Sequence, residues 1–231
     1  MENENKNESS YQNKLRDLGL NTFLAEEKQR KKIASDLHDH VGQALAMLKF
    51  KLAKLKGDAV FCGFDSDIDD MRKLIDQIIA YTRELTIELS PPILHELGFS
   101  KSMIWLKDQM AKKYQLKVVL TDDADVYIYD EALRVALFRS VQEILINTVK
   151  HAKISEASLN ISRLNEELVI KIEDQGKGFS SETLKTTGYG LFSIKERMQT
   201  LGGKFEIHSV PNEGTKTFLQ VKLNETEHTH R

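Results

Sequence analysis

The chain has 231 residues, 40% of them hydrophobic and 29% charged, which is the composition of one large or two modest globular domains. Its formal net charge of −2 provides no basic field for a polyanion, so we expect no direct nucleic-acid binding. The one cysteine, Cys62, excludes internal disulfides and favours a reducing compartment, the cytoplasm.

The N-terminal segment, residues 1–22, is polar and rich in Asn and Glu, and we predict a frayed linker there. It lacks the apolar centre of a signal peptide. No apolar run in the chain approaches the ~20 residues that span a bilayer. We therefore expect any upstream sensor domain or membrane segment to lie outside this sequence.

A long amphipathic helix is predicted for residues 23–56, where apolar positions recur at spacings of three and four without proline. These positions are Ile33, Leu37, Val41, Ala44, Leu48 and Leu55. His38 lies beside this stripe, and its neighbours one turn away are Ala34, Ser35, Val41 and Gly42. Three of the four are small, and a glycine within a helix costs roughly 0.5–1 kcal/mol. We therefore predict an accessible His38 and the close approach of another group to the backbone at Gly42.

Asp39 and Gln43 lie four residues apart, so a carboxylate and an amide share one helix face next to His38. The simplest interpretation of a lone His-Asp pair is a solvated polar face. An acidic partner on one ring nitrogen would instead fix the tautomer of His38. Adjacent helix residues project about 100° apart, so the sequence leaves open whether Asp39 is that partner.

A second helix is predicted for residues 66–89 from a regular apolar seam. The seam consists of Ile68, Met71, Ile75, Ile78, Thr82, Leu85 and Leu89. The connection between the helices, residues 57–65, is short and makes them antiparallel neighbours. Because two helices cannot enclose a core, we expect hairpins from two chains to form a homodimeric four-helix bundle.

The second helix ends at Ser90-Pro91-Pro92, because the residue before a proline leaves the helical region, and we place a domain boundary at residue 95. Helices are then predicted near residues 100–114 and 130–151 and up to 201, with strands near 116–120, 157–161, 168–172, 205–208 and 215–223. This order predicts an antiparallel or mixed sheet with helices on one face, an α/β sandwich. Residues 225–231, with His228 and His230, are predicted to be a disordered tail.

Three segments of this second domain suit a magnesium nucleotide, although each alone also fits an exposed helix or a hairpin turn. Glu143, Asn147 and Lys150 project from one helix face, where oxygens can hold Mg²⁺ and an ammonium neutralises phosphate. The run Asp174-Gln175-Gly176-Lys177-Gly178-Phe179 follows a strand, and its carboxylate can accept a hydrogen bond from an exocyclic amine. The run Gly188-Tyr189-Gly190 opens a helix, whose amide groups favour phosphate. No complete Rossmann or P-loop pattern occurs.

The motifs resemble those of two known families. The run from Ile33 to Gln43 resembles the phosphoacceptor box of two-component sensor histidine kinases, in the subfamily that pairs with NarL-type response regulators. Residues 143–152, 174–179 and 188–190 resemble, in this order, the N, G1 and G2 boxes of the GHKL ATPases. The resemblance covers residues 26–223.

This resemblance implies an α+β architecture. A dimerisation and phosphoacceptor domain, residues 23–95, would contribute one hairpin to a dimeric antiparallel four-helix bundle. A GHKL domain of the Bergerat type, residues 96–224, would follow it as an α/β sandwich that binds ATP and Mg²⁺.

The same resemblance assigns roles to single residues. Asn147 would bind Mg²⁺, and Glu143 would be catalytic and could reach the metal through a water. Asp174 would contact adenine, and Gly188 and Gly190 would flank the phosphates under a mobile lid. The other predicted nucleotide-binding residues are Lys150, His151, Gly176, Gly178, Tyr189, Leu191 and Thr215. Thr148 replaces a common alanine and Tyr189 a common leucine, and both differences concern the packing of the lid.

The predicted function is an ATP-dependent protein-histidine kinase that phosphorylates His38, assisted by Asp39, and passes the group to an aspartate of a NarL-type regulator. Gln43 matches a phosphatase motif of the subfamily, which implies that the enzyme also dephosphorylates the regulator. Two alternatives are a nucleotide-sensing dimeric adaptor without transfer and a GHKL serine kinase or ATPase. The sequence leaves open whether His38 is phosphorylated in cis or in trans.

Overall fold

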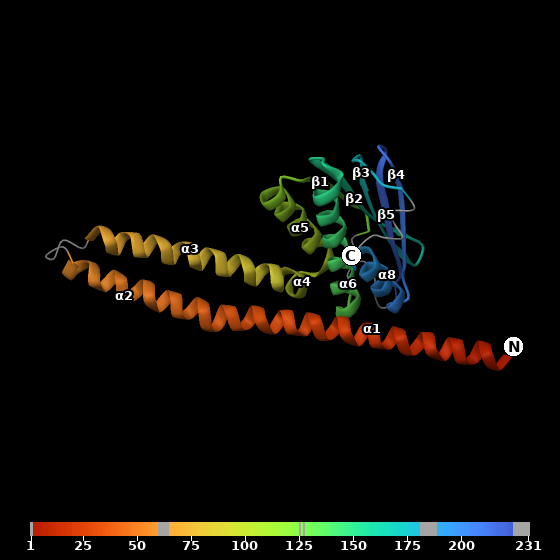
Figure 1. Ribbon diagram of the computed structural model, residues 1–231, viewed down its shortest axis with the longest axis horizontal. Coiled ribbons are helices and arrows are strands. Elements are labelled where there is room, and N and C mark those ends of the chain that lie inside the picture. The colour runs from red at the N-terminus through yellow and green to blue at the C-terminus, as the bar shows by residue number, and fades with distance from the viewer. Residues whose placement is uncertain (1, 60–64, 125, 127, 181–188, 224–231) are drawn as a thin grey trace. The chain divides into compact units, whose positions relative to one another are not determined.

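The computed structural model describes residues 2–59, 65–124, 126, 128–180 and 189–223. The chain divides into two compact units, Leu24–Pro92 and Met1–Phe23 with Ile93–Arg231. The first unit is helical, and the second contains a sheet (Figure 1). Cys62 and the predicted tail lie outside the described residues.

The first part of the chain is helical almost throughout. The α-helix α1 (Glu2–Asp36), the π-helical segment η1 (Leu37–Gly42) and the α-helix α2 (Gln43–Ala59) follow one another without a break. The described residues before position 23 are thus helical and not frayed, and their role as a linker stays a prediction. Extending an existing helix is much easier than nucleating one, and no proline stops the extension toward the N-terminus. Within the described residues, no helix combines the length and the apolar character needed to cross a bilayer.

The predicted hairpin of the first unit is confirmed. The helix α3 (Asp65–Leu89) returns antiparallel to α2, and the two helices lie side by side (Figure 1). An ion pair between Lys49 Nζ and Asp76 Oδ1, 2.6 Å apart, joins them. The helix α3 ends just before Pro91, as predicted.

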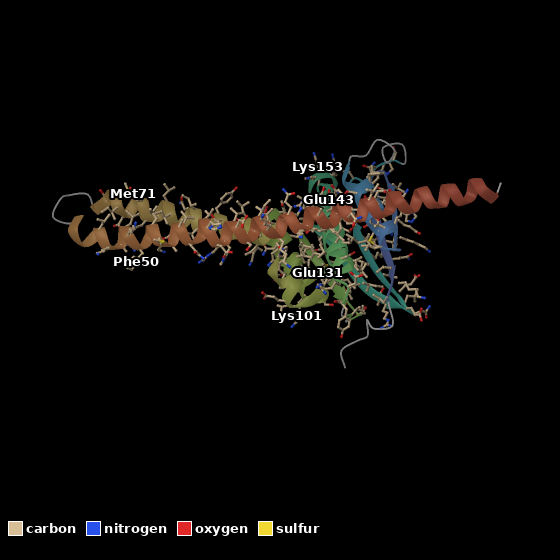
Figure 2. All side chains as sticks on the ribbon, turned by 90° about the horizontal axis from the view of Figure 1, so that it is seen from below. Phe50, Met71, Lys101, Glu131, Glu143 and Lys153 are labelled. Atoms are coloured by element: carbon tan, nitrogen blue, oxygen red, sulfur yellow. The ribbon has the colours of Figure 1, made fainter. Side chains whose placement is uncertain are left out.

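The apolar seam of α3 divides into two rows. Ile75 and Thr82 are buried in the single chain, whereas Met71 and Ile78 are 53% and 39% exposed. Figure 2 shows Met71 of α3 and Phe50 of α2 projecting away from the hairpin. The hairpin thus packs along one row and leaves another apolar row of α3 uncovered.

The second unit contains the helices and strands in the predicted order. They are α4 (Pro92–Glu96), α5 (Gly98–Tyr114), β1 (Lys117–Asp122), α6 (Glu131–Asn147), η2 (Thr148–Ala152), β2 (Glu156–Leu164), β3 (Glu167–Asp174), α8 (Tyr189–Thr200), β4 (Lys204–Val210) and β5 (Gly214–Lys222). The short helix α4 was not predicted, because the two prolines indicated only the end of the preceding helix. Proline at a first helical position also suits a helix start, since its missing N–H would have no partner there.

The five strands form one mixed sheet in the order β1-β2-β3-β5-β4. The pair β1–β2 is parallel and is connected through α6, whereas the pairs β2–β3, β3–β5 and β4–β5 are antiparallel. This arrangement agrees with the predicted sheet.

The core lies between the sheet and helices α5, α6 and α8, which cover one face of it (Figure 1). Its fully buried side chains include Met103, Leu106, Phe138, Val141, Leu159, Ile170, Ile194 and Met198. The opposite face carries ion pairs, with Glu173 between Lys171 at 2.6 Å and Lys216 at 2.9 Å. The α/β sandwich is confirmed, and it brings the end of α6 beside the end of β3.

Candidate functional site

The helix that carries His38 changes its hydrogen-bond pattern at this residue. Residues Leu37–Gly42 form a π-helical segment between two α-helical stretches, and none of them is buried. A π turn inside an α-helix is uncommon and occurs frequently at functional sites. The imidazole of His38 is 74% exposed, as predicted.

Asp39 is the acidic partner of His38 in the structure. Its Oδ1 lies 3.1 Å from Nδ1 of His38, and its Oδ2 accepts a hydrogen bond of 3.1 Å from Oγ of Ser35. A turn wider than 3.6 residues rotates each successive residue by less than 100°, which helps adjacent side chains to meet. The contact with His38 first, and the hydrogen bond from Ser35 second, lower the pKa of the Asp39 carboxyl. An Nδ1–H that donates to Asp39 leaves the lone pair on Nε2.

Gly42 and Gln43 follow this cluster. Among the described residues of the helical unit, a Cβ added at Gly42 would meet only the carbonyl oxygen of Leu37, at an ordinary 3.8 Å, so this unit shows no group at the predicted close approach to its backbone. Gln43 begins α2 and its side chain is exposed.

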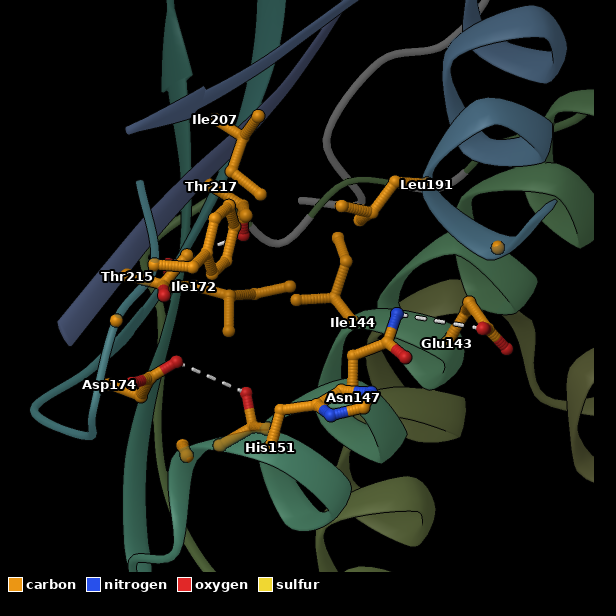
Figure 3. Close-up of a pocket in the computed structure, with 15 residues that line it drawn as sticks. Glu143, Ile144, Asn147, His151, Ile172, Asp174, Leu191, Ile207, Thr215 and Thr217 are labelled. Atoms are coloured by element: carbon orange, nitrogen blue, oxygen red, sulfur yellow. Dashed lines mark hydrogen bonds between the residues drawn. The ribbon is translucent and has the colours of Figure 1, made fainter. Parts of the chain in front are cut away.

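A cavity of about 420 Å³ opens in the second unit, between α6, η2, the start of α8 and the ends of β3, β4 and β5 (Figure 3). It is lined by Glu143, Ile144, Asn147, Thr148, His151, Ala152, Ile172, Asp174, Gly178, Phe179, Gly190, Leu191, Ile207, Thr215 and Thr217. Aliphatic side chains face a small number of polar groups, as in pockets that bind planar cofactors.

One wall of this cavity carries Glu143 and Asn147. Asn147 Nδ2 donates to Glu143 Oε1 at 3.5 Å, which leaves the amide oxygen available (Figure 3). Within the described residues, no group of three or more His, Cys, Asp or Glu side chains gathers as a metal site. One amide oxygen and one carboxylate fit Mg²⁺ that is shared with substrate phosphates, because Mg²⁺ in such sites takes few protein ligands.

Gly190 packs directly against this wall. A Cβ at this position would lie 2.5 Å from Glu143 Oε1, so any larger residue here would push the Glu143 carboxylate out of its present position. The first turn of α8 thus contributes Gly190 and Leu191 to the cavity lining beside Glu143, and the amide groups of a first helical turn have no partner within their own helix.

Asp174 lies at the opposite end of the cavity and is 7% exposed. The backbone N–H of Gly176 donates to its Oδ1 at 2.9 Å, and the hydroxyl of Thr148 donates to its Oδ2 at 3.4 Å. Thr148 is itself only 5% exposed. This contact connects residues 26 positions apart and was not predicted, since the sequence related Thr148 only to the packing of the lid.

The glycine loop after β3 is held by the turn between β4 and β5. Ser209 Oγ accepts from the N–H of Phe179 at 2.9 Å, and the N–H of Asn212 donates to the carbonyl of Lys177 at 2.6 Å. Gly178 has a φ of 55° and lies against the carbonyl of Val210, where a Cβ would clash. The loop is thus fixed with Phe179 on the cavity wall.

The structure brings most of the predicted nucleotide-binding residues to this cavity. Leu191, Thr215 and His151 line it, whereas Lys150 is exposed and does not. Both His151 and Lys150 lie in the π-helical segment η2, whose wider turn changes the direction of successive side chains relative to an α-helix. Gly176 lies behind the wall, against Ala152. Gly188 is outside the described residues, as is the side chain of Tyr189.

The apolar part of the lining was not identified from the sequence. Ile172 precedes Asp174 by two residues on the same face of β3, and the register pairs Ile172 with Thr217 and Asp174 with Thr215. The strand alternation marked Ile172 as buried. It did not show at which end of the strand the core gives way to a cavity.

Two family models match the chain. One, described as histidine kinase, matches residues 29–94, and the other, described as histidine kinase-, DNA gyrase B-, and HSP90-like ATPase, matches residues 132–225. The first match contains His38, and the second contains the cavity.

Curated relatives include two bacterial sensors. The sensor protein VraS of Staphylococcus saprophyticus is 28% identical over 213 residues, which are 92% of this chain and 60% of that protein. The sensor histidine kinase ComP of Bacillus subtilis is 31% identical over 211 residues, 87% of this chain and 27% of that protein. The chain thus spans 60% or less of the length of these relatives.

Similar solved structures include the histidine kinase domain of a blue-light activated histidine kinase from Erythrobacter litoralis, with a TM-score of 0.49 and 14% identity, covering 78% of this chain and 94% of that one. The histidine kinase AdeS of Acinetobacter baumannii has a TM-score of 0.46 and 13% identity, covering 77% and 96%.

Proposed function

The chain belongs to the two-component histidine kinase family, and from that premise we propose that it transfers the γ-phosphoryl group of ATP to Nε2 of His38. The observation that carries this proposal is the 3.1 Å contact between Asp39 and Nδ1 of an imidazole that is 74% exposed. It leaves the reactive nitrogen, Nε2, toward solvent with its lone pair free.

The transfer step follows from this geometry. The lone pair of Nε2 attacks the γ-phosphorus in line, a P–N bond forms, and the bond between the γ-phosphorus and the β–γ bridging oxygen breaks, so that ADP leaves with the electron pair. The imidazole gains positive charge as the bond forms, and Asp39 neutralises this charge and accepts the Nδ1 proton. Alignment and charge neutralisation are the main requirements of phosphoryl transfer.

The cavity of the second unit would hold the nucleotide. Asp174 would accept a hydrogen bond from the exocyclic amine of adenine, while Ile144, Ile172 and Ile207 contact the ring. Asn147 and Glu143 would hold Mg²⁺, which supplies charge neutralisation at the phosphates. The amide groups at the start of α8 would bind the phosphates directly.

The proposed kinase consists of two domains with the predicted boundaries. Residues 23–95 would dimerise and carry the phosphoacceptor, and residues 96–224 would bind ATP.

Dimerisation through the hairpin is supported by its uncovered apolar surface. The exposed side chains are Leu48 and Leu55 on α2 and Met71, Leu74, Ile78 and Tyr81 on α3. A monomer would leave this row in water, whereas a second hairpin would bury it.

We further propose that the phosphoryl group passes from His38 to an aspartate of a NarL-type response regulator, and that Gln43 assists the later hydrolysis of this phospho-aspartate to the free carboxylate and inorganic phosphate. Gln43 is exposed on the same helix as His38. Its amide can donate and accept at once and so hold a water for in-line attack on a phospho-aspartate.

Incubation of the full chain with γ-labelled ATP and Mg²⁺ tests the kinase proposal. We expect label that is stable in base and lost in acid, as for a P–N bond, and no label in His38→Gln. A His38→Gln protein that still binds ATP supplies the control for folding. Acid-stable label would instead indicate a serine kinase, and ATP binding without any label would indicate an adaptor.

A further inference from the structure

Ser35 uses its hydroxyl differently from other hydroxyls in the described helices. Four threonines donate to the carbonyl oxygen four residues earlier, which is a common choice for a helical hydroxyl. These are Thr22, Thr82, Thr86 and Thr200. Ser35 instead donates forward, to the carboxylate of Asp39 at 3.1 Å. Its hydroxyl therefore engages the side chain that faces His38.

The two oxygens of Asp39 have different partners. Oδ1 lies against Nδ1 of His38 and Oδ2 accepts from Ser35, both at 3.1 Å. A carboxylate bound through one oxygen can rotate about its Cβ–Cγ bond, whereas partners on both oxygens fix its plane. Ser35 belongs to α1 and Asp39 to the π-helical segment, so the hydrogen bond also connects the two kinds of helix across the transition.

The imidazole of His38 receives little orientation from packing, because it is 74% exposed. Its tautomer and ring plane therefore depend on the hydrogen bond to Asp39, and that hydrogen bond depends on the orientation of the carboxylate. Without a second partner, the exposed carboxylate of Asp39 would rotate away from His38 part of the time and hydrogen-bond to water instead.

We propose that Ser35 is a positioning residue for phosphoryl transfer, whose hydroxyl holds the Asp39 carboxylate on Nδ1 of His38 and so keeps Nε2 unprotonated as the nucleophile. This inference rests on the proposed kinase function. Ser35 acts only through Asp39 and contacts neither nucleotide nor reacting atoms.

The first test is the rate of autophosphorylation of the full chain at saturating ATP and Mg²⁺. We expect Ser35→Ala to slow it about 3- to 10-fold, the effect of losing one hydrogen bond to a charged group at an exposed position, with an unchanged KM for ATP. Ser35→Thr, which keeps the hydroxyl, should restore the rate. Alanine favours helix more than serine, so a slower Ser35→Ala enzyme does not reflect helix loss. Ser66→Ala, at an exposed serine in α3, is the matched control and should keep the wild-type rate.

The second test asks whether Ser35 acts through Asp39. In an Asp39→Asn background, where transfer is followed over long single-turnover times, Ser35→Ala should cause no further loss. A double-mutant cycle of this kind isolates the coupling between the two side chains. Equal losses from Ser35→Ala in both backgrounds would overturn the proposal, as would a wild-type rate in Ser35→Ala or a Ser35→Thr enzyme that stays as slow.

The third test reads the tautomer without any reaction. In the full chain labelled with ¹⁵N-histidine, with the His38 signals assigned by comparison with His38→Gln, we expect the neutral ring to carry its proton on Nδ1. The Ser35→Ala chain should shift toward the Nε2–H tautomer, and an unchanged tautomer ratio would contradict the proposal. If the wild type is never labelled by ATP, the kinase proposal fails while this measurement still decides the role of Ser35.

Discussion

The contact between Thr148 and Asp174 predicts that Thr148→Val weakens ATP binding and lowers the selectivity for adenine over a purine without the exocyclic amine. Valine has nearly the shape of threonine but cannot donate to Asp174 Oδ2, which would leave one oxygen of a buried carboxylate without its 3.4 Å partner. Hydrogen bonds to charged groups contribute about 1.5–3 kcal/mol, and the length of this one places it at the lower end. A loss of about 1.5 kcal/mol corresponds to a roughly tenfold increase in the Kd for ATP.

The assay is equilibrium binding of Mg-ATP, by calorimetry, to His38→Gln chains with and without Thr148→Val. Purine riboside triphosphate, which lacks the exocyclic amine, serves as the second ligand. We expect Thr148→Val to raise the Kd for ATP about tenfold and to change the Kd for the analogue little, so that discrimination between them falls. Thr148→Ser should behave as wild type, and Thr86→Val, at a part-buried threonine of the hairpin, controls for the substitution.

Equal effects of Thr148→Val on both ligands would refute this reasoning. The hydroxyl would then stabilise the cavity as a whole and would not specifically orient the carboxylate of Asp174. An unchanged Kd for ATP would show that the backbone N–H of Gly176 alone suffices to orient the carboxylate.

Three further predictions concern the wall, the hairpin and the proposed phosphatase. Gly190→Ala places a Cβ 2.5 Å from Glu143 Oε1 and should weaken Mg-ATP binding, measured by calorimetry, by displacing the Glu143 carboxylate, whereas an unchanged Kd would show that Glu143 moves aside without affecting the site. Ile78→Asp should convert a dimer into a folded monomer in sedimentation, while Ile75→Asp, buried within the hairpin, should lower helix content as well, because an unpaired buried charge costs several kcal/mol. Gln43→Ala should keep autophosphorylation but slow dephosphorylation of the cognate regulator by about 10²–10⁴-fold, and a wild-type phosphatase rate would assign Gln43 a structural role.

The order of helices and strands was predictable because their apolar patterns repeat regularly over long stretches of sequence. The alternation in β2 and β3 and the seam of α3 each repeat over several residues, and each forms where predicted. The seam alone did not show that Ile75 packs within one hairpin while Ile78 stays exposed, since one stripe serves both contacts.

The two π-helical segments were not predictable from these patterns. Each changes the hydrogen-bond spacing over only five or six residues, too few to alter the apolar period of a long helix. Both segments nevertheless carry residues of the site: Asp39 contacts the adjacent His38 in the first, and the second contains His151, which lines the cavity, and Lys150, which does not. The contact of Thr148 with Asp174 joins a helix to a strand end, and no local pattern indicates it.

The measurement that tests the central claim most directly is ³¹P NMR of the autophosphorylated full chain, combined with ¹⁵N labelling of histidine. The contact of Asp39 with Nδ1 predicts one phosphohistidine, on His38, with phosphorus bonded to Nε2. Phosphorus bonded to Nδ1 of His38, or to another residue in a chain whose His38 is intact, would contradict the account.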